Sequence, residues 1–541
     1  MASSASTEPP ADLIRRAVAA LGRRAWDEAA ELASAALERS GPEANALMVL
    51  AAVRVEAGDL AAGIDLFERA RALMPTHIHV LTNLASAYRA TGRLEDARRT
   101  IEAALAVDPR FAIAHNNLGN VLVDLGERAA ALGAYQRAVA LDRSYPDPVA
   151  GLARIAEEEH RLEDARALAE RALQLAPQSV VAALTLARVG LRQDDAPAAV
   201  TLLEALLRGG GLTHTNRSIA LGYLGEGHHR LGRYADAFAA FTEANEIEHA
   251  QYAAAFADAH GALTPAGVAA LTAFVDGADP AAWHPAPAST RDPVFLVGFP
   301  RSGTTLLDQI LASHPQVETL EERDSLLDAA SELARPEAFG RWADLPAREI
   351  ERLRELYWKR VSAGLGGAPG KPVFVDKQPL NAVLMPLIHR LFPAARVILV
   401  LRDPRDVVLS CWQQRFGMNA AMYQLLRLDS ATAYYDAVMR LVEASRRRLP
   451  LRVHAVKYED VIAGFDATVR TLLDFLGLEW DERVRHYAAT ARKRVIGTPS
   501  AAQVVRPLYG SARGRWRNYR NFLAPHLGAL QPWVRLFGYE A

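Results

Sequence analysis

A 34-residue period in the first half of the chain is the feature that most restricts how this sequence can fold. Small residues and helix-ending residues return at the same place in each period. A repeat of this length is typical of arrays in which each period forms two antiparallel helices, with glycine ending the first helix and proline ending the second. Three sets of equivalent positions in successive periods show this most clearly: Gly92 and Gly126; Ala97, Ala131 and Ala165; and Ala104, Ala138 and Ala172.

This pattern resembles the tetratricopeptide repeat (TPR). We expect about seven repeats over residues 8–250, stacked as an α-solenoid whose concave face binds a protein or peptide. A generic alanine-rich helical bundle is the alternative, and the regular period argues against it. Residues 251–292 break the period and are predicted to form a connecting helix and a linker rich in proline and alanine.

Short apolar runs alternate with helical segments from residue 293 to the end of the chain. This alternation predicts a parallel sheet with helices on both faces. Ligands of such sheets bind at the carboxyl ends of the strands. The runs are Val294–Val297, Val373–Val375, Val397–Leu401 and Val453–Val456.

A glycine-containing turn follows the first of these runs and leads into a helix. The segment Gly298–Gly303 has both glycines of the phosphate-binding loop pattern GxxxxGK[ST], but Thr304 replaces its lysine. Without this lysine, and with no obvious aspartate to hold magnesium, a nucleotide-hydrolysing enzyme or a P-loop kinase is disfavoured. The loop carries its own cation, Arg301, followed by Ser302, Gly303, Thr304 and Thr305, a set that suits an anion bound without metal.

The segment PRSGTTLL after a strand resembles the 5′-phosphosulfate loop of sulfotransferases that use 3′-phosphoadenosine 5′-phosphosulfate (PAPS). The tyrosylprotein branch of this family is the most similar. The resemblance extends from Pro293 to Tyr519 through five motifs in the family's order. It implies a P-loop-like α/β sulfotransferase domain over residues 293–541 that binds PAPS and needs no metal.

The resemblance also assigns two residues to the terminal 3′-phosphate of PAPS. Arg402 ends an apolar run and Ser410 follows two helical turns later, and a fixed guanidinium with a hydroxyl suits a phosphate monoester. An ion pair between Arg402 and Asp406 is the alternative for this motif. The family has an arginine four positions after the serine; here that position is Gln414, and Arg415 is next to it.

Two further residues are predicted to act on the transferred group. Glu322 lies 21 residues after Arg301, which is the family's interval to the catalytic base, and an alcohol or phenol needs such a base. Lys377 resembles the lysine that neutralises charge on the oxygen between sulfate and the 5′-phosphate. The alternatives are a solvated helix start for Glu321–Glu322 and a surface lysine in a turn.

The last motif is predicted to close over the nucleotide. By resemblance, Ser500 touches the transferring group, and the basic residue before Trp516 is Arg515 where the family has lysine. A solvated basic tail from Arg506 to Arg520 is the alternative. The nucleotide-binding residues assigned to this part of the chain are Tyr458, Gln503, Val504 and Arg515.

Composition limits the partners of the chain. It has 541 residues, 62 Lys and Arg against 63 Asp and Glu, and a formal net charge of −1, so nucleic acid is not an expected partner. We find no signal peptide and no apolar run long enough to span a membrane. Cys411 is the only cysteine, which fits a reducing compartment. These features predict a cytoplasmic protein, with Cys411 a small buried residue and not a nucleophile.

Together these residues predict sulfuryl transfer from PAPS to a hydroxyl, that of a protein tyrosine presented with the help of the TPR array. Asp324 and Asp328 stand where family members that act on acidic peptides carry arginines, so an acidic context is disfavoured. Sulfation of a small molecule or a carbohydrate is an alternative. A non-catalytic TPR scaffold with a degenerate nucleotide fold is another. The sequence does not define an oligomeric state.

Overall fold

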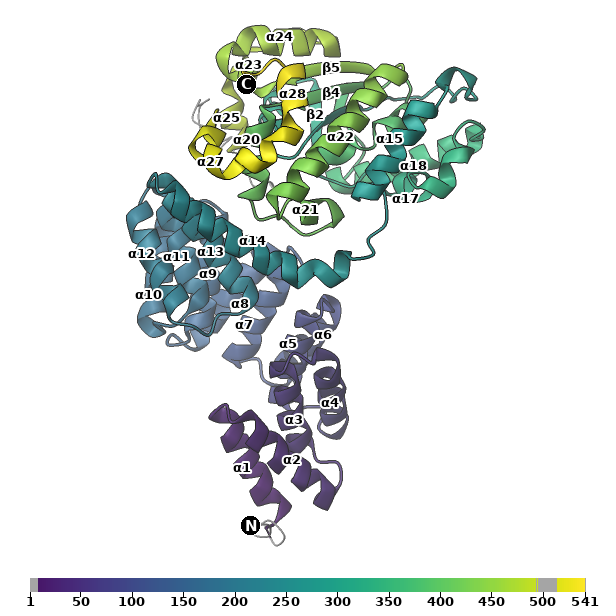
Figure 1. Cartoon of the computed structure of the whole chain (residues 1–541). Helices are drawn as coiled ribbons and strands as arrows, with labels where there is room; N and C mark the ends of the chain where they lie inside the picture. The colour runs from purple at the N-terminus through teal and green to yellow at the C-terminus, as the bar shows by residue number, and fades with distance from the viewer. Residues whose placement is uncertain (1–7, 493, 495–512, 541) are drawn as a thin grey trace. The chain divides into compact units, whose positions relative to one another are not determined.

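The computed structural model of the chain describes residues 8–492, 494 and 513–540 (Figure 1). The chain divides into two compact units, Met1–Gly211 and Leu212–Ala541, each with hydrophobic clusters of its own. None of the helices among these residues is long and apolar enough to cross a membrane.

Helix–turn–helix pairs make up the first unit, as the 34-residue period predicts. The repeated alanines, including Ala97, Ala131 and Ala165, are completely buried, because a methyl group lets neighbouring helices approach closely. The solenoid fold is therefore confirmed. The pairs are α1 (Pro10–Gly22) with α2 (Trp26–Ser40), α3 (Ala44–Glu56) with α4 (Leu60–Leu73), α5 (Ile78–Ala90) with α6 (Leu94–Val107), α7 (Ala112–Asp124) with α8 (Arg128–Leu141), α9 (Pro146–Glu158) with α10 (Leu162–Leu175), and α11 (Val180–Arg192) with α12 (Ala196–Arg208).

The turn inside each pair requires one residue in the left-handed region of backbone space. Gly92 and Gly126 provide it with φ of 75° and 80°. Where glycine is absent, Arg24, His160 and Asp194 adopt φ of 59°, 61° and 62°. A residue with a Cβ atom loses about 1–2 kcal/mol in this conformation. Helix pairing therefore fixes the turn geometry even where the local residue disfavours it.

The second unit begins with a further helix pair, α13 (His214–Arg230) and α14 (Tyr234–Phe256). It continues through α15 (Pro265–Gly277) and the 3-10 helix η1 (Pro280–Ala282) to the sheet. Because α13 and α14 keep the form of a repeat, we retain residues 8–250 as the proposed extent of the array. Residues 251–292 remain the proposed connector and 293–541 the proposed catalytic domain.

Five parallel strands form the sheet, in the order β2–β3–β1–β4–β5. In the centre, Leu296 of β1 lies opposite Lys377 of β3, and Gly298 lies opposite Val400 of β4. The parallel sheet that the apolar runs predict is confirmed. The strands are β1 (Val294–Gly298), β2 (Val317–Glu321), β3 (Val373–Lys377), β4 (Arg396–Leu401) and β5 (Arg452–Lys457).

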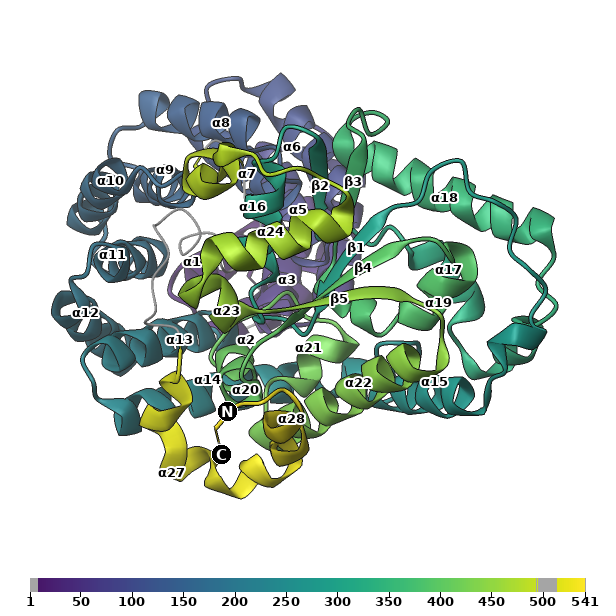
Figure 2. The same cartoon turned by 90° about the horizontal axis from the view of Figure 1, so that it is seen from above.

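Alternate residues of β1 point to opposite faces of the sheet. Val294 and Leu296 pack in a cluster with α16 (Thr304–Ala312) and α24 (Phe465–Leu476). Phe295 and Val297 belong to another cluster, which includes residues of α15 and of three further long or central helices. These helices are α18 (Ala347–Leu365), α19 (Met385–Leu391) and α22 (Leu428–Arg448). Figures 1 and 2 show α24 and α22 on opposite sides of β5.

The remaining elements are short and fill the connections. They are α17 (Leu327–Leu333), η2 (Pro336–Arg341), η3 (Pro379–Ala382), α20 (Pro404–Trp412), α21 (Ala420–Gln424), α23 (Tyr458–Ala463), η4 (Glu482–His486), α25 (Tyr487–Ala491), η6 (Arg515–Tyr519), α27 (Arg520–Leu523), η7 (Ala524–Leu530) and α28 (Gln531–Leu536).

Strand β2 is not among the strands that the apolar runs predict. Its residues read VETLE, and two of the five are charged because β2 lies at an edge of the sheet. The alternative interpretation of Glu321–Glu322 as a helix start is wrong, since Glu321 ends this strand.

Candidate active site

The predicted site residues that the structure describes follow the carboxyl ends of the five strands. Arg301 lies in the loop after β1, Glu322 directly follows β2, Lys377 ends β3, Arg402 directly follows β4 and Tyr458 directly follows β5. Because all five strands are parallel, these ends meet at one edge of the sheet. Residues spread over more than 150 positions of the sequence are therefore brought to one place.

The loop between β1 and α16 is closely packed against its neighbours. A Cβ atom on Gly298 would lie 2.7 Å from the Val400 carbonyl oxygen. Gly303 caps α16 with φ of 107°, and a Cβ atom there would lie 2.7 Å from Cδ2 of Tyr458. Ser302, Thr304 and Thr305 are all buried. Both glycines of the phosphate-loop pattern are thus required by contacts of this structure.

Arg301 joins this loop to the residues predicted to hold the 3′-phosphate. Its backbone is left-handed, with φ of 68°. Its Nε donates to Oγ of Ser410 at 3.1 Å, and its carbonyl oxygen accepts from Nη1 of Arg402 at 3.0 Å. The Arg402 guanidinium also lies over the Tyr458 ring, 5.1 Å from its centroid. Two guanidinium groups and a hydroxyl therefore converge beside the loop.

Asp406 mainly accepts hydrogen bonds from the backbone and does not form the close ion pair with Arg402 that the sequence offers as an alternative. Its Oδ2 lies 3.9 Å from Nη2 of Arg402, at the outer limit of an ion pair. Its two oxygens accept instead from the backbone N–H groups of Gly514, at 2.6 Å, and Trp516, at 2.9 Å. Asp406 thus holds the returning C-terminal segment against α20, and this places Arg515 near Arg402.

Lys377 and Glu322 form an ion pair at the ends of β3 and β2, in which the lysine is buried and the glutamate is partly exposed. The Lys377 Nζ lies 2.7 Å from Oε1 of Glu322 and 3.2 Å from Oε1 of Glu321. Its side chain is 0% exposed, whereas that of Glu322 is 37% exposed. Glu322 has a left-handed backbone with φ of 44°, and its N–H donates to the Lys377 carbonyl oxygen at 2.7 Å. The alternative of a surface lysine in a turn is wrong.

The last predicted motif is only partly described. Ser500, Gln503 and Val504 lie outside the described residues. Arg515 begins η6, and its Nη2 lies 2.7 Å from Nε2 of His229. Trp516 and Tyr519 are buried and Arg515 is half-buried, whereas Arg513, Arg517 and Arg520 are exposed, so the described part of the predicted basic tail is anchored by its aromatic residues and keeps solvated arginines.

Gln414 and Arg415, which follow Ser410 near the position of the family's phosphate-binding arginine, make contacts within the protein. Nε of Arg415 pairs with Oε1 of Glu248 on α14 at 2.7 Å, and Nε2 of Gln414 donates to the Arg415 carbonyl oxygen. Glu248 is buried and also accepts from the Ser218 hydroxyl at 2.5 Å. Arg415 therefore fixes α14, and this contact had no signal in the sequence.

Cys411 is a buried packing residue, as the sequence predicts. Its Sγ donates to the Pro300 carbonyl oxygen at 3.3 Å. Burial raises the pKa of its thiol to about 12, so it stays protonated at neutral pH and is not a nucleophile.

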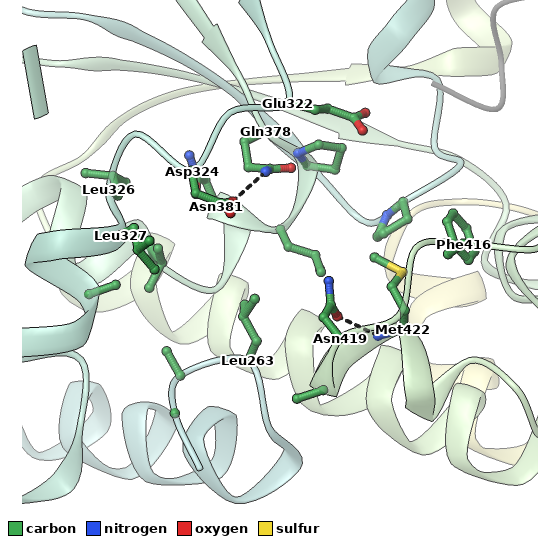
Figure 3. Close-up of a pocket in the computed structure, with 18 of the residues that line it drawn as sticks. Leu263, Glu322, Asp324, Leu326, Leu327, Gln378, Asn381, Phe416, Asn419 and Met422 are labelled. Atoms are coloured by element: carbon green, nitrogen blue, oxygen red, sulfur yellow. Dashed lines mark hydrogen bonds between the residues drawn. The ribbon is translucent and has the colours of Figure 1, made fainter. Parts of the chain in front are cut away.

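A cavity of about 460 Å³ opens beside the loop and Glu322 (Figure 3). Arg301, Thr304, Thr305 and Glu322 line it at the sheet edge. In Figure 3, Leu326 and Leu327 lie on its left, Phe416 and Met422 on its right, and Leu263 below. Gln378, Asn381 and Asn419 add a few polar groups. A mainly apolar cavity that reaches a carboxylate suits an acceptor with an apolar body and one polar end.

The two aspartates singled out in the sequence differ in their surroundings. Asp324 lines the cavity and accepts from Nε2 of Gln378 at 3.1 Å. Asp328 does not line it; its carboxylate pairs with Arg360, which holds the pKa of Asp328 below its usual value. Of the two aspartates, only Asp324 is therefore among the residues that line the cavity.

Within the described residues, no group of three or more His, Cys, Asp or Glu side chains is arranged to hold a metal ion.

Comparison with known proteins agrees with this geometry. Residues 293–482 match a model described as the sulfotransferase family. Two tetratricopeptide repeat models match residues 54–118 and residues 14–77, 119–180 and 184–253.

Individual relatives cover only part of the chain. An uncharacterized protein of Aquifex aeolicus is 32% identical over 256 residues, which are 45% of this chain and 32% of the relative. Protein-tyrosine sulfotransferase A of Caenorhabditis elegans is 24% identical over 259 residues, 46% of this chain and 67% of the relative. A solved thermophilic TPR protein of Thermus thermophilus is 26% identical and covers 34% of this chain and 99% of its own, with a TM-score of 0.31.

The C-terminal match coincides with the strands and loops that gather the site residues. The chain thus joins an N-terminal array of tetratricopeptide repeats to a sulfotransferase-family domain at residues 293–482.

Proposed function

We propose that this chain is a PAPS-dependent sulfotransferase whose acceptor is the phenolic hydroxyl of a protein tyrosine. The observation that carries the proposal is the meeting of three groups at one sheet edge. These are the arginines of the anion site, the Lys377–Glu322 pair, and the apolar cavity that Glu322 lines. Together they provide an anion site, a base and an acceptor pocket.

The residues present fit the nucleotide. The loop from Arg301 to Thr305, whose packing excludes a side chain at Gly303, would hold the 5′-phosphosulfate. Arg402, Ser410 and Arg515 would hold the 3′-phosphate, and Tyr458 would pack on the nucleotide. Burial, followed by the Arg402 charge, lowers the pKa of Arg515. Like charges gathered in a partly buried place are stabilised by a bound anion, which supports this assignment.

The remaining chemistry belongs to Glu322, Lys377 and Arg301. When bound, PAPS supplies an activated sulfuryl group, whose bond to the 5′-phosphate oxygen breaks as the acceptor oxygen bonds to sulfur. Glu322 accepts the proton of the acceptor hydroxyl, since it is the carboxylate that lines the cavity next to the loop. Lys377 and Arg301 stabilise the negative charge that spreads over the oxygens, and Ser500 is proposed to assist them.

The cavity favours a phenol over a carbohydrate as acceptor. Leucine, methionine and phenylalanine side chains, together with alanines and prolines, form the apolar part of its walls, and this part suits an aromatic ring better than a sugar with many hydroxyls. Asp324 in the lining disfavours acidic neighbours of the acceptor. We further propose that the repeats, a fold that commonly binds proteins, capture the protein that carries the tyrosine.

The test is a transfer assay with PAPS and four acceptors, followed by mass spectrometry of the products. The acceptors are a tyrosine peptide with neutral and basic flanks, the same peptide with acidic flanks, a small phenol and a hexose. We expect sulfation of the neutral or basic peptide first and none of the hexose. Transfer to the small phenol alone would contradict the protein acceptor, and no transfer to any hydroxyl would leave the scaffold alternative.

A further inference from the structure

The last repeat helices pack directly onto the elements that carry the site. The ring of Phe238 on α14 lies 4.8 Å from that of Trp412 at the end of α20 and stacks on Phe522 at 4.4 Å. Nδ2 of Asn245 donates to the Trp412 carbonyl oxygen at 2.9 Å. Since α20 also carries Ser410, the pair α13–α14 is a structural part of the second unit.

His229, in the last turn of α13, lies between two residues of the C-terminal segment. Its Nε2 is 2.7 Å from Nη2 of Arg515, and its Nδ1 is 2.9 Å from the Tyr519 hydroxyl. The rings of His229 and Tyr519 are stacked, with 5.8 Å between their centroids and 11° between their planes. The Tyr234 ring meets the His229 ring edge at 5.6 Å. The imidazole is therefore held in one orientation.

The contact with Arg515 defines the protonation of this ring. A guanidinium group only donates hydrogen bonds, so Nε2 of His229 must be the acceptor and carries no proton. The neutral ring then keeps its proton on Nδ1 and donates to the oxygen of Tyr519. Burial and the charge of Arg515 lower the pKa of His229 to about 4, which agrees with a neutral ring.

Arg515 is consequently held from two sides. Asp406 on α20 fixes its backbone through the N–H groups of Gly514 and Trp516, and His229 fixes its guanidinium. A long arginine side chain is otherwise free to adopt many rotamers, and ordering them reduces affinity for an anion. The contact from α13 removes this freedom before any anion binds.

We propose that His229 is a positioning residue of the nucleotide site, which directs the Arg515 guanidinium toward the 3′-phosphate. This inference rests on the proposed function, because it takes Arg515 to bind PAPS. It gives the helix pair α13–α14 a role in donor binding.

The test uses the full chain and titration of adenosine 3′,5′-bisphosphate, with binding followed by calorimetry. His229→Ala is expected to weaken binding about tenfold, the effect of losing one hydrogen bond to a charged group. His229→Gln is expected to restore most of the affinity, because the glutamine Oε1 accepts from Arg515 near the position of Nε2. Thermal unfolding checks that each variant is folded.

A double-mutant cycle separates positioning from a general structural effect. In the Arg515→Ala background, His229→Ala is expected to change the affinity less than twofold, because its effect acts through Arg515. The matched control is His249→Ala on α14, which loses a similar stack and hydrogen bond to Tyr423 but does not touch Arg515. It is expected to leave the affinity unchanged.

The outcomes distinguish this inference from the proposed function. Wild-type protein that does not bind the nucleotide would overturn both. Binding that is weakened by Arg515→Ala but not by His229→Ala, or equal losses for His229→Ala in both backgrounds, would overturn the positioning role alone.

Discussion

Glu322→Gln is expected to lower kcat by about 10²–10⁴-fold, the range for removal of a general base. The amide has nearly the shape of the carboxylate but cannot accept the proton of the acceptor hydroxyl. Lys377 keeps an ionic partner in this variant, since Glu321 lies 3.2 Å from its Nζ. The fold and the affinity for adenosine 3′,5′-bisphosphate should therefore change little. Steady-state transfer assays and calorimetry measure the two quantities.

Glu321→Gln is the matched control for this substitution. It changes the neighbouring carboxylate in the same way, but Glu321 does not line the cavity. Its expected loss of kcat is much smaller than that of Glu322→Gln. Equal losses for the two variants would show that the charge balance around Lys377 matters and that Glu322 is not the base.

Lys377→Met is expected to lower kcat by about 10²–10³-fold, because it removes a fixed charge that stabilises the transition state. It also leaves two carboxylates without their cation at a position where the lysine side chain is 0% exposed. The free energy of unfolding should fall by roughly 1–3 kcal/mol, less than for a fully buried pair because the Glu322 side chain is 37% exposed. Transfer assays and denaturant unfolding measure the two effects.

A second substitution separates these two effects. Glu321→Gln in the Lys377→Met background removes one uncompensated charge, so part of the stability should return while kcat stays low. Recovery of activity together with stability would show that Lys377 serves the fold and has no direct part in transfer.

The fold could be predicted where a physical requirement repeats along the chain. The alanines at 34-residue spacing are needed wherever two helices approach closely, so the period reports the solenoid. The central strands are buried on both faces and appear as continuous apolar runs, as in Val397–Leu401. The edge strand β2 exposes part of its surface and carries Glu318, so its sequence has no such run.

The site could be predicted where its residues directly follow a strand. Glu322 and Arg402 do so, Lys377 ends its strand and Arg301 lies three residues after one, and the order of these motifs along the chain is enough to predict them. His229 is 286 residues away from Arg515, in a segment whose pattern reports only helix packing. No local signal indicates a contact of this kind.

Other pairings between side chains that are distant in the sequence could not be predicted either, because they too have no local signal. The sequence treats Asp324 and Asp328 as equivalent, and only the fold shows that Arg360 neutralises the second. Likewise, Arg415 stands next to the position of a family phosphate ligand, but the fold pairs it with Glu248.

The central claim is tested most directly by calorimetric titration of adenosine 3′,5′-bisphosphate into the wild type, Arg402→Ala and Arg427→Ala, without added metal. Arg427 is the control, since its side chain forms an exposed ion pair with Glu246 and does not line the cavity. We predict micromolar binding to the wild type and to Arg427→Ala, and loss of binding in Arg402→Ala. Absence of binding to the wild type at millimolar nucleotide would contradict the sulfotransferase proposal.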